Sequence, residues 1–178
     1  FSMGTTAMLA AWLPTFFQEM GGISIQRFAI AAMIGFAGGL VGTLTVGMLM
    51  DRFGPYRVVP FYYFAMAAAL FLLGRVPFGT PIFIALLICW SFGQTGGQSG
   101  INMLAAQYYP VSIRSTGIGW MGGAGRIGGV LVPLFGGWAL SHALTLQTTM
   151  ALVAIAPFIV GLLFLILRPG ADRTSRPS

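Results

Sequence analysis

Long apolar segments alternate with short polar turns along the whole chain. A transmembrane helix needs about 20 consecutive, mostly apolar residues, and six segments approach or exceed that length. They are residues 1–18, 27–50, 58–74, 81–107, 116–140 and 148–167. The turns between them contain Gly, Pro, Ser, Thr or charged residues, which favour reversal of the chain. The pattern predicts an all-α polytopic membrane protein with six transmembrane helices.

The composition indicates that lipid surrounds most of this chain. Hydrophobic residues make up 57% of the 178 residues and charged residues only 7%, whereas soluble domains carry about 25% charged residues. Small residues allow membrane helices to approach closely, so we interpret Gly35, Gly38, Gly39 and Gly42 as packing positions rather than a binding site. The net charge of +6 does not indicate nucleic-acid binding, because the Arg residues are scattered and form no basic face.

The first residue, Phe1, lies inside an apolar segment. We therefore expect the chain to be a fragment that begins partway through a longer protein. Residues 1–167 would form a transmembrane domain. Residues 168–178 are polar, which is typical of a disordered tail.

Arginines at the ends of the predicted spans indicate the orientation. Cytoplasmic loops carry an excess of Lys and Arg, and the more basic side of this chain is the one that holds both ends. We therefore expect both ends in the cytoplasm, with the spans in a bacterial inner membrane. The more basic side carries Arg52, Arg57, Arg114, Arg168, Arg173 and Arg176, and the other side carries Arg27 and Arg75.

The most distinctive turn runs from Gly47 to Arg57 and concentrates charge between two uncharged segments. It resembles the loop motif of the major facilitator superfamily, G-x-x-x-D-R-x-G followed by basic residues. The matching positions are Gly47, Asp51, Arg52 and Gly54, while Pro55 and Tyr56 replace the usual basic residues and Arg57 follows late. The resemblance implies the C-terminal half of a twelve-helix fold, built from two inverted three-helix repeats, with an N-terminal half missing.

The charges of this turn predict a gate at the cytoplasmic face. Asp51 can accept hydrogen bonds from a neighbouring helix end, and Gly54 permits a backbone turn with positive φ. Arg52 and Arg57 can pair with carbonyl groups at helix C-termini or with acids, and we count Arg114 with the same gate motif. Pairs that form in one conformation only would bias alternating access. A plain positive-inside anchor is the alternative.

A second signature runs from Tyr108 to Arg114 and leads into a Gly-rich segment that contains Arg126. Together with the residues from Trp12 to Thr15, it resembles the aromatic acid:proton symporters of that superfamily, which carry 4-hydroxybenzoate and related acids. The resemblance covers residues 1–168 and implies a small organic acid and a proton as partners. Carriers of sugars or non-aromatic acids share parts of both signatures, so another substrate class is the alternative.

Arg126 is the strongest candidate for substrate binding. It lies about ten residues into its predicted span, roughly 15 Å deep, near the middle of a hydrocarbon core of about 30 Å. Its neighbours three and four positions away are Gly122, Gly123, Gly129 and Val130, which leaves that face nearly bare. A guanidinium can bind both oxygens of a carboxylate. The alternative is a structural ion pair with an acid from missing sequence.

Polar and aromatic residues elsewhere can complete such a site. Gln94, Gln98 and Asn102 recur every four residues and so share one helix face, where they can bond a ring hydroxyl or line a water path. Hydrogen bonding between helices is an equal alternative. Trp12 can stack on an aromatic ring. The tyrosines near the turns, Tyr56, Tyr62, Tyr63, Tyr108 and Tyr109, are expected in an interfacial belt, and His142 at a surface without a coupling role.

The residue pattern contains no catalytic arrangement, since it lacks a nucleophile with a nearby base and paired carboxylates within the spans. We expect neither an enzyme nor a cofactor or metal site, although a six-span scaffold or membrane enzyme is the alternative outside transport. Glu19, Asp51 and Asp172 all lie at or beyond span ends. A coupling carboxylate for proton symport is therefore expected in the missing half.

Overall fold

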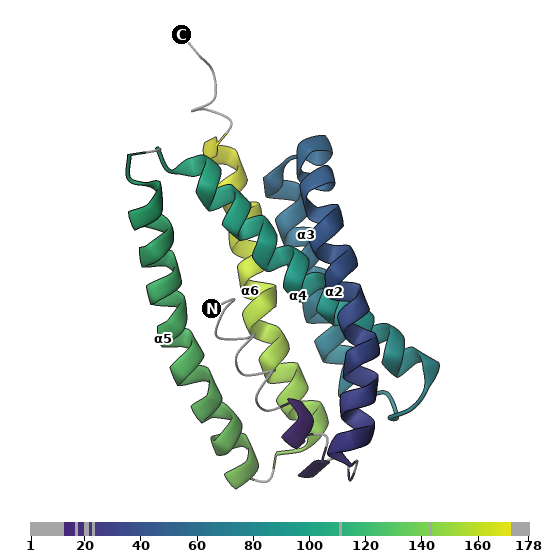
Figure 1. The fold of residues 1–178 in the computed structure, drawn as a ribbon. Coiled ribbons are helices and arrows are strands. Elements are labelled where there is room, and N and C mark those ends of the chain that lie inside the picture. Colours follow the sequence, from purple (N-terminus) through teal and green to yellow (C-terminus); the bar gives the residue numbers. More distant parts are fainter. Residues whose placement is uncertain are drawn as a thin grey trace.

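The computed structural model describes residues 13–16, 18, 19, 22, 24–110, 112–142 and 144–171, which contain helices and no strand. The helices are α2 (Ile25–Phe53), α3 (Pro55–Leu73), α4 (Pro81–Tyr108), α5 (Arg114–Ser141) and α6 (Leu146–Ala171) (Figure 1). Their bounds agree closely with the second to sixth predicted spans. Most of the first predicted span lies outside the described residues, although residues 13–16, 18 and 19 are helical.

Three segments of the described part are long and apolar enough to cross a membrane. They are Gln26–Phe53, Pro55–Leu73 and Leu146–Ile166. Helix α4 is not among them, in keeping with the polar residues Gln94, Gln98 and Asn102 in its second half. The all-α prediction is therefore confirmed for the described residues, whereas the arrangement of six spans as two inverted repeats stays a prediction.

Helix boundaries follow local sequence signals. Pro55 and Pro81 occupy the first positions of α3 and α4, where the missing N–H of proline costs no hydrogen bond. The Thr80 side chain caps α4 by accepting a hydrogen bond of 3.2 Å from the Phe83 amide. The single residue Gly54 joins α2 to α3 with φ 81° and ψ 149°, a backbone conformation that is essentially restricted to glycine.

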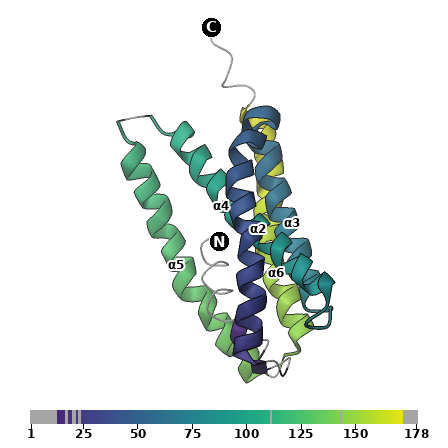
Figure 2. The same cartoon turned by 45° about the vertical axis from the view of Figure 1, so that its right-hand side comes forward.

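Helix α4 is the centre of the bundle. It packs against α2 and α3, and α3 packs against α6, whereas α5 touches the rest at few points. Figures 1 and 2 show α5 standing beside the other helices rather than among them. Among the described residues, α2, α3, α4 and α6 therefore form a compact group to which α5 is loosely attached.

Glycines allow α2 and α4 to approach closely, as the sequence predicted. A Cβ atom at Gly42 would lie 2.5 Å from the carbonyl oxygen of Phe92, and one at Gly38 would overlap the carbonyl oxygen of Ile88. A Cβ at Gly39 would lie 2.8 Å from the Thr95 hydroxyl. These contacts confirm the interpretation of the glycine segment as a packing surface.

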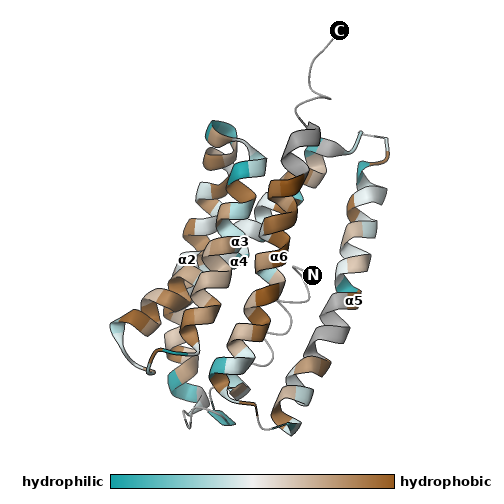
Figure 3. Cartoon of the chain, turned by 180° about the vertical axis from the view of Figure 1, so that it is seen from behind, coloured by the Kyte–Doolittle hydropathy of each residue, from teal (hydrophilic) through white to brown (hydrophobic). Residues whose placement is uncertain are grey.

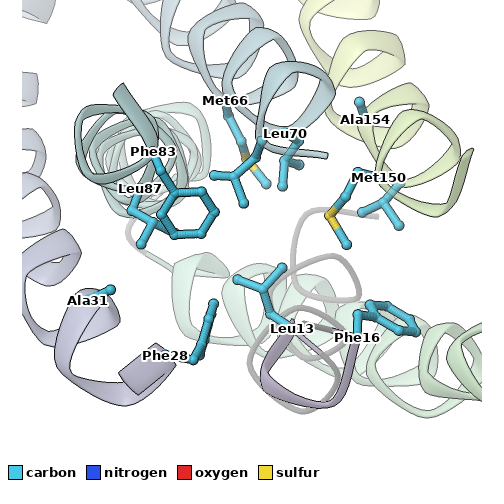
Figure 4. Packing of buried hydrophobic residues seen from close by; sticks show 12 residues of the cluster. Leu13, Phe16, Phe28, Ala31, Met66, Leu70, Phe83, Leu87, Met150 and Ala154 are labelled. Carbon is cyan, nitrogen blue, oxygen red and sulfur yellow. The ribbon is translucent and has the colours of Figure 1, made fainter. Parts of the chain in front are cut away.

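The largest buried cluster joins five parts of the chain near one end of the bundle. Figure 4 shows Leu13 and Phe16 beside residues of α2, α3, α4 and α6. Phe16, Leu70 and Phe83 in this cluster are fully buried. The short helical piece around residue 13 is therefore part of the core.

Many large apolar side chains of the described helices are exposed, and Figure 3 shows hydrophobic residues along much of α6. Met33, Leu40 and Leu44 on α2 are each at least 70% exposed. Exposing such a surface to water would cost about 25 cal/mol per Å². Lipid or another protein surface is the environment that suits it.

Candidate functional site

The charged turn lies at the junction of α2 and α3. Asp51, Arg52 and Arg57 are exposed there, and the Arg52 guanidinium lies 5.3 Å from the centre of the Phe53 ring. The Gly54 amide donates a 2.9 Å hydrogen bond to the Met50 carbonyl oxygen. The positive φ predicted for Gly54 is confirmed, whereas the pairing of Asp51 and of the arginines in a gate stays a prediction.

Arg114 lies at the same end of the molecule as the turn (Figure 1). Its Nε donates a 3.3 Å hydrogen bond to the Tyr109 carbonyl oxygen. A Cβ atom at Gly117 would lie 2.9 Å from the Tyr109 ring, so that ring packs closely on the first turn of α5. Tyr109, Arg114 and Gly117 thus contact one another at the corner between α4 and α5, a role that the sequence did not reveal.

The end that carries these residues is the more basic one among the described residues. Arg52, Arg57 and Arg114 lie there, and α6 ends there at Ala171, whereas Arg27 and Arg75 lie toward the opposite end (Figure 1). The described residues of the predicted gate motif, including Gly47 in the last turns of α2, thus lie toward the same end of the molecule, with Arg114 on a different helix from the turn.

Arg126 lies near the middle of α5. It is twelve positions beyond Arg114, which corresponds to about 18 Å along the helix axis, and its side chain is exposed. A Cβ atom at Gly122 or Gly123 would meet no heavy atom within 4 Å. That part of the α5 face is therefore bare, as the sequence predicted.

A shallow groove of about 440 Å³ runs along α5 on the same stretch. Thr116, Gly119, Trp120, Gly123, Ala124 and Ile127 line it. Trp120 is 76% exposed. This helix thus offers an aromatic ring, an apolar groove and a cationic group on an open surface.

The three polar residues predicted to share one helix face, Gln94, Gln98 and Asn102 (the polar stripe), lie on α4, and two of them are hydrogen-bonded to each other. Gln94 is buried. The Gln98 amide nitrogen donates a 3.4 Å hydrogen bond to the Asn102 side-chain oxygen, and Asn102 is exposed. Because α4 and α5 touch at few points, the structure does not bring this stripe and Arg126 into one enclosed pocket. Trp12 lies outside the described residues.

The interfacial position expected for two tyrosines is wrong. Tyr62 and Tyr63 are buried inside the bundle, with exposed fractions of 0% and 2%. The Tyr62 hydroxyl lies 2.9 Å from the Thr45 hydroxyl and donates to the Gly42 carbonyl oxygen at 3.3 Å. Its ring stacks on Phe92 with a 4.5 Å centroid separation. The tyrosine fits because Gly93 and Gly96 on α4 carry no side chain at the contact.

His142 is exposed at the end of α5, in agreement with the surface position expected for it. Its Nδ1 lies 3.0 Å from the Trp138 carbonyl oxygen and 3.1 Å from the Ser141 hydroxyl. Its ring centre is 4.7 Å from that of Trp138. These contacts attach the ring to its own helix.

Comparison with known proteins gives one family and a consistent set of relatives. Residues 1–178 match the family model described as Major Facilitator Superfamily. The chain is 34% identical over 154 residues to the gallate transporter of Pseudomonas putida, covering 86% of this chain and 34% of that protein. It is 36% identical over 132 residues to the 4-hydroxybenzoate transporter PcaK of Acinetobacter baylyi, covering 74% of this chain and 28% of that protein.

A third relative matches nearly the whole chain. The 3-(3-hydroxy-phenyl)propionate transporter of Escherichia coli is 36% identical over 176 residues, covering 97% of this chain and 42% of that protein. The chain therefore spans roughly a third of the length of the curated relatives it matches. No solved structure matches it significantly.

Proposed function

This chain belongs to the Major Facilitator Superfamily, whose members are transporters rather than enzymes, and from that premise we propose that it forms one half of a secondary active transporter for aromatic or other small organic acids. The observation that carries the proposal is the similarity to transporters named for gallate, 4-hydroxybenzoate and 3-(3-hydroxy-phenyl)propionate. Each of these compounds combines an aromatic ring with a carboxylate.

Arg126 is the residue that we assign to the substrate carboxylate. A charge near the centre of a membrane costs about 2.5–3.5 kcal/mol on insertion scales and normally faces a cavity or a partner. The bare glycine surface beside Arg126 leaves room for a planar anion, which the guanidinium can bind through two parallel hydrogen bonds. Gln94, Gln98, Asn102 and Trp12 would contact the ring and its hydroxyl groups from the other side of the path.

The charged end would supply the gate. Gly47, Asp51, Arg52, Gly54, Arg57 and Arg114 share that end of the bundle. Ion pairs that form there in only one conformation would shift the balance between inward-open and outward-open states. The described residues contain no acid deep in a helix, so we place the proton-coupling carboxylate in an N-terminal half of the transporter.

The proposed topology has six spans arranged as two inverted three-helix repeats, the arrangement found in each half of these transporters. The basic end would face the cytoplasm of a bacterial cell, with both ends of this chain on that side of the inner membrane. Helix α6 continues to Ala171, so residues 168–171 are helical rather than part of the disordered tail predicted from residue 168, and we propose a cytoplasmic tail only beyond them.

Uptake measurements on the intact transporter test this function. Cells expressing it should accumulate labelled 4-hydroxybenzoate, and excess unlabelled gallate should compete. Arg126→Ala should reduce uptake at least tenfold, since losing one charge-assisted bidentate contact costs about 1.5–3 kcal/mol. Arg27→Ala, which removes an exposed arginine at the opposite end of the bundle, is the matched control and should transport normally.

Different outcomes of these measurements test the binding site and the substrate class independently. Normal uptake by Arg126→Ala would remove Arg126 from the binding site without affecting the transport proposal. Uptake of a sugar or a non-aromatic acid that aromatic acids do not inhibit would replace the substrate class. Expression at the membrane of both variants must be equal for the comparison to count.

A further inference from the structure

A second groove lies between α3 and α6 and is lined by residues of these two helices alone. Its volume is about 760 Å³. Four small residues line it, Ala67, Ala68, Ala151 and Ala154, together with the larger Phe64, Phe71, Leu152, Ile155 and Phe158, and with Thr148. It is separate from Arg126, which lies on α5.

Close contacts between the two helices bound this groove at each end. Near one end, a Cβ atom at Gly74 would lie 3.0 Å from the Met150 Cβ. Near the other, a Cβ at Gly161 would lie 3.0 Å from the Phe64 ring, and the Phe64 and Phe158 ring centres are 5.4 Å apart. Between these contacts α3 and α6 stay packed on each other, and the small alanine side chains leave an open groove along their junction.

The dimensions fit one acyl chain. Residues 148 to 158 rise about 15 Å along the α6 axis. That length is half of a hydrocarbon core of about 30 Å and therefore the depth of one leaflet. The lining is almost entirely apolar, so it suits a hydrocarbon chain that runs parallel to the helices.

A cationic group lies at the outer end of the groove. The Arg75 guanidinium stacks 3.7 Å from the centre of the Phe71 ring, and Phe71 lines the groove. One nitrogen of Arg75 donates a 2.7 Å hydrogen bond to the Phe71 carbonyl oxygen. A guanidinium has five N–H donors, so others can reach a phosphate above the groove.

We propose that this groove binds an anionic glycerophospholipid, with one acyl chain between α3 and α6 and the phosphate at Arg75. Some lipid covers any membrane-facing surface, so the claim concerns selection. Arg75 would favour an anionic headgroup over a zwitterionic one because the stacking on Phe71 holds the guanidinium where the headgroup emerges. The site is independent of the transported substrate.

Lipid retention by the intact transporter tests this site. The protein is placed in nanodiscs of phosphatidylcholine with one-fifth phosphatidylglycerol, extracted into detergent and analysed by mass spectrometry for bound lipid. Wild-type protein should retain phosphatidylglycerol and phosphatidylcholine in a ratio about fivefold above their ratio in the bilayer, which corresponds to about 1 kcal/mol per basic residue near a membrane surface. No enrichment in wild-type protein would overturn the proposal.

Substitutions of arginine test whether the enrichment of phosphatidylglycerol depends on Arg75 beside the groove. Arg75→Gln should abolish it, and Arg75→Lys should keep most of it because the charge remains. Arg27→Gln removes an exposed arginine toward the same end of the bundle, on α2, and should retain the wild-type ratio. An equal loss in Arg27→Gln would show general attraction to basic residues and would refute a specific site.

The groove itself is tested by filling it. Ala68→Trp should reduce retention of both lipids, because the indole occupies the space of the acyl chain. A second copy of the protein is the competing occupant, and Ile155→Cys in a Cys89→Ala background detects it. A disulfide-linked dimer in the bilayer would overturn the lipid assignment, whereas a monomer would support it.

Discussion

Gly42 on α2 is the position where the helix packing makes its sharpest prediction. A Cβ atom there would lie 2.5 Å from the Phe92 carbonyl oxygen and 3.2 Å from the Phe92 Cα, which are both backbone atoms of α4. A side chain could rotate away, but a helix backbone cannot. Gly42→Ala therefore forces α2 and α4 apart at the most extensive helix contact of the bundle.

The magnitude follows from two opposing effects. Inserting a methyl group into a tightly packed contact costs about 1–3 kcal/mol. Replacing a helical glycine by alanine gains about 0.5–1 kcal/mol. The two ranges combine to a net loss of about 0–2.5 kcal/mol for Gly42→Ala, and the contact with backbone atoms places the expected loss in the upper half of that range.

Two matched variants turn this estimate into a ranking. At Gly39 the nearest atoms are the Thr95 and Ser91 hydroxyl oxygens, at 2.8 and 3.0 Å, which can move, so Gly39→Ala should cost less. At Gly122 nothing lies within 4 Å, so Gly122→Ala should be neutral or stabilising in this chain. The free energy of unfolding is measured by denaturant titration of the purified intact protein in detergent micelles.

The order of the unfolding free energies of the three variants tests the close approach of α2 and α4. The expected order of stability is Gly122→Ala above Gly39→Ala above Gly42→Ala. Equal stability of Gly42→Ala and Gly122→Ala would refute the close approach of α2 and α4. A strongly destabilised Gly122→Ala would instead show that another surface covers the bare face of α5.

Two further predictions concern buried and strained positions. Tyr62→Phe should lower the free energy of unfolding by about 0.6–1.5 kcal/mol, because it removes the hydroxyl that bonds Thr45 and hydrogen bonds between membrane helices contribute about this much. Tyr56→Phe is the control. Equal unfolding free energies of the two variants would contradict the prediction. Gly54→Ala should cost about 1–3 kcal/mol, because φ is 81° there and such conformations are strained for other residues. Gly47→Ala, whose nearest contact would be Met103 at 3.6 Å, is its control in the same unfolding assay, and a Gly54→Ala protein as stable as that control would count against the strained turn.

The helices were largely predictable because their signals are local. Apolar length sets the extent of a span, and Pro55, Pro81 and Gly54 mark where one helix ends and the next begins. Whether a residue faces the interior of the bundle or its outer surface was less predictable. Tyr62 is near a turn in the sequence but lies two turns inside α3, where it faces the glycines of α4. That complementarity depends on which helices pair, and one sequence does not specify the pairing.

The residues of the candidate site could be predicted from their types in the sequence, but their arrangement in space could not. A charged residue inside an apolar segment stands out in any sequence, so Arg126 was found, and the bare glycines beside it were found by counting helical positions. The corner from Tyr109 to Gly117 was missed because its hydrogen bond joins a side chain to a backbone carbonyl. The relation of Arg126 to the polar stripe on α4 also needs three-dimensional placement.

The proposed site lies on the least packed helix of the chain, and this has a consequence for the transporter. Arg126 is exposed on α5, and α5 makes few contacts with the other described helices. A guanidinium at mid-depth in lipid is costly, so a surface or a ligand must cover that face in the membrane. If the other half supplies that surface, Arg126 lies at the junction between halves that move relative to each other. Substrate bound there would contact both halves, and its affinity would differ between conformations, which is the requirement for a ligand to shift a conformational equilibrium.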